Sequence, residues 1–86
     1  MTLLDFHMNN SRLIKCFEQG LGVSADQVTD SLAYNSIKQW DSVAHMVLVA
    51  AIETEFDIMM DTDDILAMSS VAVARQILQK YGIVFE

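Results

Sequence analysis

The sequence predicts a small all-α protein, a bundle of three main helices plus one short helix, with a long loop between helices one and two. Three stretches place apolar residues at the spacing of an amphipathic helix, and a residue that favours a helix start precedes each of them. The chain has no proline, and only the short tail 83–85 competes as a strand. Its 86 residues, 52% of them hydrophobic and 20% charged, suit a single folded domain over residues 1–86.

The first main helix is predicted from four apolar residues that share one face, Leu13, Ile14, Phe17 and Leu21. Asn10 or Ser11 is suited to cap its start, and Gly20 or Gly22 to end it. The spacing does not decide whether residues 3–6 extend this helix or form a turn before it.

Residues 23–40 are predicted to form the long loop, because they are rich in Ser, Asp, Asn and Thr and their apolar residues are irregularly spaced. A connection of this length without its own secondary structure is uncommon in a compact domain, and it is usually functional or wrapped over the core. The loop ends at Trp40, which we expect to be a buried anchor at the junction with the next helix.

The second main helix is predicted from Ser42 to Phe56, with Asp41 as its cap. Its core stripe consists of Leu48, Val49, Ile52 and Phe56. On roughly the opposite side is a second apolar stripe, Val43, Met46, Val47 and Ala50. So few helices are available to cover both sides that we expect the second stripe to be exposed, and only partly covered by the short helix through Ile65 and Met68.

The short helix is predicted to begin near Thr62, in an acidic segment. A cap at Ser69 or Ser70 then starts the last main helix, which ends at Gly82. This helix places Val71, Ala74, Leu78 and Tyr81 on one face.

Composition narrows the classes of function. A net charge of −7, much of it between residues 53 and 64, disfavours nucleic-acid binding and favours partners with basic surfaces. The longest apolar run, residues 46–52, is too short to span a membrane. The single cysteine, Cys16, cannot form an internal disulfide, and the first residues do not resemble a signal peptide. We therefore expect a cytoplasmic, monomeric protein.

Ser42 stands at the predicted start of the second helix, beside the second stripe. A serine after an aspartate at a helix start most often serves capping alone. The N-terminus of a helix is nevertheless where free N–H groups and the positive end of the helix dipole favour a phosphate group. If Ser42 carried a phosphodiester, this position would suit it.

The stretch WDSVAHMVLVAAIETEF, residues 40–56, resembles the Asp-Ser-(Leu/Ile/Val) attachment motif and second helix of acyl carrier proteins, in which the serine is joined to 4′-phosphopantetheine. The similarity covers about residues 11–82, and the Trp-Asp-Ser start resembles discrete bacterial carriers outside central fatty acid synthesis. Other residues that fall where this family places them are Gly22-Val23, Val28-Thr29, Glu53, Glu55-Phe56, the acidic short helix and Ser70-Val71.

The resemblance implies a carrier rather than an enzyme. A phosphopantetheinyl transferase would move the arm from coenzyme A to Ser42, and the arm's thiol would hold an acyl or aminoacyl intermediate as a thioester for the enzymes of a biosynthetic pathway. The other partners expected are acyl-loading and acyl-transfer enzymes with basic or apolar docking surfaces. The residues expected to contact partners are Asp41, Val43, Met46, Val47, Ala50 and Glu53. Ala44 and Val47 stand where carboxylates are common in the family, so we expect a dedicated set of partners.

Other interpretations of the sequence are weaker. Asp30-Ser31-Leu32 matches the attachment motif more literally than residues 41–43, but no amphipathic helix follows it. A serine hydrolase built on Ser42 and His45 lacks a third orienting group and an oxyanion site. His7 and His45 with Cys16 do not have the spacing of a zinc site, so no metal is expected.

The aspartates between residues 57 and 64 do not make a calcium-binding EF-hand loop, because the positions that require glycine and glutamate hold Leu66 and Ala72. The remaining alternative to a carrier is an unmodified helical protein-interaction module that binds a partner through the exposed stripe of the second helix.

Overall fold

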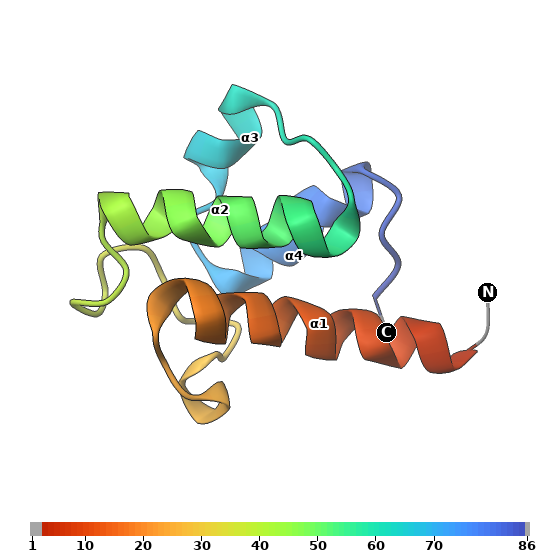
Figure 1. Ribbon diagram of the computed structural model, residues 1–86, viewed down its shortest axis with the longest axis horizontal. Helices are drawn as coiled ribbons and strands as arrows, with labels where there is room; N and C mark the ends of the chain where they lie inside the picture. Colours follow the sequence, from red (N-terminus) through yellow and green to blue (C-terminus); the bar gives the residue numbers. More distant parts are fainter. Residues whose placement is uncertain (1–2, 86) are drawn as a thin grey trace.

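The computed structural model describes the backbone of residues 3–85 and the side chains of residues 8–85. The helices are α1 (Leu3–Leu21), the 3-10 turn η1 (Ala25–Gln27), α2 (Ser42–Phe56), α3 (Thr62–Ala67) and α4 (Val71–Lys80). α1 and α2 pack against each other and run antiparallel, with α4 behind them and α3 on the side of α2 away from α1 (Figure 1). Residues 3–85 contain no strand, only an isolated bridge between Ala33 and Ser70. The predicted all-α bundle with three main helices and one short helix is confirmed.

The start of α1 differs from the prediction. The helix begins at Leu3, so residues 3–6 extend it, and the capping role predicted for Asn10 or Ser11 is wrong because both lie inside the helix. The Asn10 side chain instead accepts hydrogen bonds from Arg75 of α4, at 3.1 and 3.3 Å. Asparagine is a residue type that often caps helix starts, but here Asn10 lies inside the helix and contacts α4.

The end of α1 is set by Gly22, which has a φ of +69° and donates its N–H to the Glu18 carbonyl. This left-handed conformation costs little at glycine, so Gly22 is the helix stop. The other predicted stop, Gly20, lies inside the helix against α2.

Trp40 anchors the loop between α1 and α2. Its side chain is fully buried, and its ring meets that of Phe17 of α1 edge to face, with 5.3 Å between centroids. Val28 and Leu32 are buried as well, and Leu32 accepts a backbone hydrogen bond from Val71 at the start of α4. The loop therefore wraps over the core, and the anchoring role predicted for Trp40 is confirmed.

The predicted core stripe of α2 is buried, and the helix has the predicted bounds. Its four core residues pack with apolar residues of α1, the loop and α4. Ile65 and Met68, expected to cover part of the second stripe, belong to this core or pack against it. At the start of α4, the Ser70 side chain accepts from the Val73 N–H, as predicted for one of the two candidate caps.

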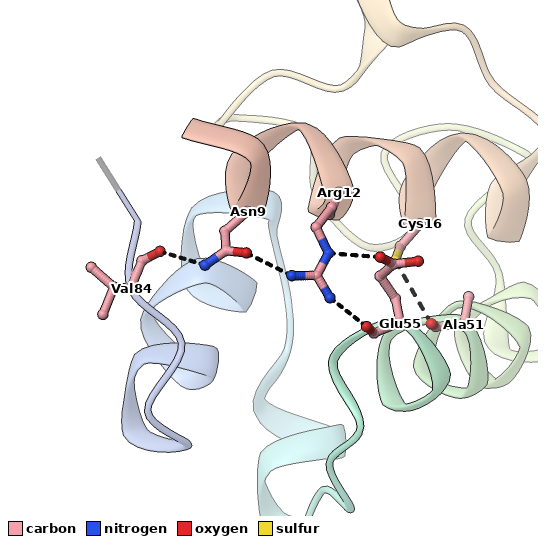
Figure 2. A network of polar contacts seen from close by, with 6 residues as sticks. All are labelled: Asn9, Arg12, Cys16, Ala51, Glu55 and Val84. Carbon is pink, nitrogen blue, oxygen red and sulfur yellow. Dashed lines mark hydrogen bonds and ion pairs between the residues drawn. The ribbon is translucent and has the colours of Figure 1, made fainter. Parts of the chain in front are cut away.

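Polar contacts fasten the tail that follows α4 to α1 and to the end of α2 (Figure 2). The Asn9 side chain donates to the Val84 carbonyl at 3.0 Å and accepts from Arg12 at 2.7 Å. Arg12 also donates to the carboxylate and the carbonyl of Glu55, at 2.7 and 2.6 Å, and lies over the Phe56 ring. These contacts hold the tail as irregular chain rather than as a strand. None of the described helices is long and apolar enough to cross a membrane.

Candidate functional site

Ser42 is the first residue of α2, and its side chain is exposed. The cap of the helix is Asp41, whose extended backbone precedes the first turn and whose carboxylate accepts the Ala44 N–H at 2.8 Å. Because Asp41 provides the cap, the hydroxyl of Ser42 is not required for it. The helix start therefore presents a serine that reagents can reach from solvent.

The competing serine, Ser31, has different surroundings. It lies in the loop, and its hydroxyl pairs with that of Thr29 at 3.2 Å. Asp30 forms an ion pair with Arg75 at 2.9 Å, and Leu32 is buried. No helix begins at this sequence, so the literal motif lacks the helix N-terminus that Ser42 has.

The second apolar stripe of α2 is exposed, as predicted. Val43, Met46 and Val47 are 73%, 55% and 51% exposed, and Ala50 is exposed too. Leu66 of α3 adds another exposed apolar side chain, at 77%. Monomeric proteins rarely leave several large apolar side chains of one helix in water without a binding role.

Glu53, predicted to contact partners, also has a structural role. Its carboxylate accepts the Met60 N–H at 2.9 Å, and its carbonyl accepts the Ile58 N–H at 3.1 Å. These bonds fix the connection from α2 to α3, which starts at Asp57 with a φ of +54°. Upstream of Glu53, residues 42–52 contain no Asp, Glu, Lys or Arg, so the exposed stripe carries no full charge of its own.

A cavity of about 260 Å³ opens beside Ser42. Its lining consists of Tyr34, Ser42, His45, Leu66, Met68 and Ser69. The residues come from the loop, from the first turn of α2, and from α3 and the segment that follows it. The cavity is largely apolar and Ser42 is part of its lining, so a group attached to Ser42 would start beside an apolar surface.

His45, which lines this cavity, forms hydrogen bonds with both the loop and α3. Trp40 Nε1 lies 2.9 Å from His45 Nδ1, and His45 Nε2 lies 2.8 Å from the Ile65 carbonyl oxygen. An indole nitrogen can only donate, so Nδ1 accepts and Nε2 carries the hydrogen that Ile65 accepts. The imidazole also stacks on the Trp40 ring at 16°, and Tyr34 meets it edge to face.

Neither hydrogen bond of His45 was predicted from the sequence. The available signal was the buried tryptophan five residues earlier, because the N–H of a buried indole requires an acceptor. Cys16 is buried, and burial raises the pKa of its thiol to about 11. Among the residues with described side chains, no three His, Cys, Asp or Glu residues are grouped so that they could hold a metal ion. The side chain of His7, considered as a metal ligand, lies outside the described residues.

Neither a protein-family model nor a curated protein matches this chain. The function is therefore argued from the motif at residues 40–56 and from the surroundings of Ser42.

Proposed function

We propose that this protein is a cytoplasmic acyl carrier whose Ser42 takes a 4′-phosphopantetheine arm. The arm's thiol holds an acyl or aminoacyl group as a thioester and presents it to enzymes of a biosynthetic pathway outside central fatty acid synthesis. The observation that carries the proposal is the coincidence of three features at one place. An exposed serine, the N-terminus of a 15-residue helix and an exposed apolar stripe meet at the start of α2. Because residues 40–56 resemble the attachment motif of acyl carrier proteins, we interpret Ser42 as the serine that receives the phosphopantetheine arm.

The attachment reaction suits the exposed position of Ser42. The serine oxygen attacks the phosphorus of coenzyme A that bears the pantetheine group, a new phosphodiester forms, and adenosine 3′,5′-bisphosphate leaves. The transferase supplies the metal and the base, and Asp41 is the residue that precedes the attacking serine. The product phosphate then lies at the N-terminus of α2, where the first N–H groups of the helix and its dipole favour an anion.

Partner enzymes in this proposal dock on the second stripe of α2. Val43, Met46, Val47 and Ala50 supply apolar area without charge, and methionine adapts its shape to different surfaces. Asp41 and Glu53 flank the stripe with negative charge, one on each side along the chain. The arm keeps its cargo at a high local concentration near a docked enzyme, so weak and brief contacts are sufficient.

Mass spectrometry tests the attachment directly. The apo protein is incubated with coenzyme A, Mg²⁺ and a phosphopantetheinyl transferase of broad specificity, and the modified peptide is then mapped. We expect the mass of one phosphopantetheine group on Ser42, no modification of Ser42→Ala, and full modification of Ser31→Ala. Modification of Ser31 would overturn the assignment of the site. A lack of modification by several transferases would favour the unmodified interaction module instead.

A further inference from the structure

α3 is held against the rest of the protein from two sides. A helix of six residues is too short to be stable in isolation, so its position depends on these contacts. On one side, the Asp64 carboxylate accepts from Lys80 and from the Tyr81 hydroxyl, at 2.6 and 2.7 Å. On the other side, facing α2, the Ile65 carbonyl accepts from His45 Nε2 at 2.8 Å. The bond from His45 is the one beside Ser42.

The hydrogen bonds of His45 require a neutral imidazole. Protonation would place a hydrogen on Nδ1, 2.9 Å from Trp40 Nε1, so two donors would face each other. The buried indole would then lose its acceptor, which costs more than the loss of an exposed hydrogen bond. Trp40 is fully buried and packed against Phe17, whereas His45 is only partly buried, so the imidazole is the group that turns. A turned ring no longer directs its Nε2–H at the Ile65 carbonyl.

The groups around the imidazole do not offset a positive charge. From the loop, the uncharged Tyr34 and Trp40 rings face it. At the start of α2, the Asp41 carboxylate is bonded to the Ala44 N–H. The acids of α3 are Asp63, which is exposed, and Asp64, which is paired with Lys80 and Tyr81. No carboxylate with a described side chain forms an ion pair with His45.

We propose that His45 sets the separation of α2 and α3 beside Ser42, and that it does so only as a neutral imidazole. Ser42 and His45 of α2 and Leu66 of α3 all line the cavity, so its width depends on the separation of these two helices. Protonation of His45 therefore releases α3 on its α2 side and opens the cavity, while the contacts of Asp64 keep α3 attached to α4. The inference concerns the fold itself, and it holds whether or not Ser42 is modified.

Hydrogen exchange of the α3 amides tests this role. The Ile65 N–H, bonded to the Asp61 carbonyl at 3.0 Å, is the reporter, and rates are corrected for the intrinsic effect of pH. When the pH is lowered from about 7.5 until nitrogen NMR shows that the imidazole is protonated, we expect its exchange in the wild type to accelerate about tenfold. His45→Phe, which keeps a ring without either hydrogen bond, should exchange rapidly at both pH values.

Two further measurements keep the proposal falsifiable if His45→Phe folds poorly. Nitrogen NMR of the wild-type imidazole at about pH 7.5 should show a hydrogen on Nε2 and none on Nδ1. Nile red, a neutral apolar dye, should bind more once the imidazole is protonated, with unchanged helical circular dichroism. Unchanged exchange of Ile65 after His45 is protonated would overturn the proposal, as would a hydrogen on Nδ1 at about pH 7.5.

Discussion

Gly20 of α1 lies directly against Leu48 of α2. A Cβ atom at position 20 would stand 2.8 Å from the Leu48 Cα, closer than Cβ atoms pack against other atoms in proteins, and 3.1 Å from the Leu48 Cβ, which is also a tight contact. The two long helices can approach each other this closely because residue 20 has no side chain. Gly20 therefore serves the packing of the bundle.

Gly20→Ala should destabilise the protein. In an exposed helix interior the same change would add about 1 kcal/mol of stability, because alanine favours the helix. Here the new methyl group overlaps backbone, and overpacking of this kind costs roughly 1–3 kcal/mol. Urea denaturation followed by circular dichroism measures the effect. The packing argument fails if Gly20→Ala is more stable than the wild type. The control is Gly82→Ala, where a Cβ meets no atom within 4 Å and the φ of +90° alone disfavours alanine.

The elements best predicted from the sequence are those whose signals are local. α2 has the predicted bounds because Asp41 caps it through the Ala44 N–H, three residues away, and because its core stripe has helical spacing. Ser70 caps α4 in the same way. Both stripes of α2 also have the predicted exposure, since the short bundle leaves one side of that helix without a neighbour.

The features that were missed depend on partners far along the chain. The Asn9 side chain bonds to the carbonyl of Val84, 75 positions away. The helix that contains Asn9 begins at Leu3, before the start that the capping residues predicted. Nothing in the sequence distinguishes Asp64 from the neighbouring acids, yet it is 8% exposed and pairs with Lys80 and Tyr81 at the end of α4. The hydrogen bond from His45 to Ile65 spans 20 positions. Such contacts join different elements, so the spacing of apolar residues within one helix cannot predict them.

Trp40→Ala should lower the stability by about 3–5 kcal/mol, because it removes a fully buried tryptophan and leaves a cavity between the loop and α1. Urea unfolding measures the loss. Trp40→Phe separates packing from hydrogen bonding, since it keeps an aromatic ring against Phe17 and removes only the N–H that His45 accepts. Trp40→Phe should therefore lower the free energy of unfolding less than Trp40→Ala does. A Trp40→Ala variant that melts like the wild type but no longer supports partner turnover would instead assign Trp40 to the docking surface.

Asp64 should make the stability depend on acid pH. Hydrogen bonds from Lys80, and then from Tyr81, lower the pKa of its carboxyl. A carboxyl whose pKa is lower in the folded state adds stability that is fully present above its unfolded value of about 3.9 and is lost as the pH falls through the folded value. Asp64→Asn should therefore be less stable than the wild type near neutral pH, and the difference should shrink below about pH 4. Thermal melts of both proteins across this range measure it, with Asp63→Asn as the exposed control. A difference that stays constant with pH would contradict this account.

Val47 and Val49 provide a matched pair for the second stripe. Val47 is 51% exposed and Val49 is 2% exposed, although they lie two residues apart on one helix. Val47→Glu should change the stability by no more than about 0.5 kcal/mol, as is usual for surface substitutions. Val49→Glu should unfold the protein, because it buries a carboxylate without a partner.

Under the proposed carrier function, Val47→Glu should still receive the phosphopantetheine arm on Ser42, while transfer of cargo by its cognate enzyme falls. The new carboxylate would have to lose its water in an apolar contact, which is unfavourable. The same variant should be a better substrate for enzymes that expect an acidic second helix. Melting curves, intact mass after modification and transfer rates together separate the effects on folding, attachment and docking. Unfolding of Val47→Glu would assign the second stripe to the core, and normal transfer by the cognate enzyme would remove Val47 from the docking surface.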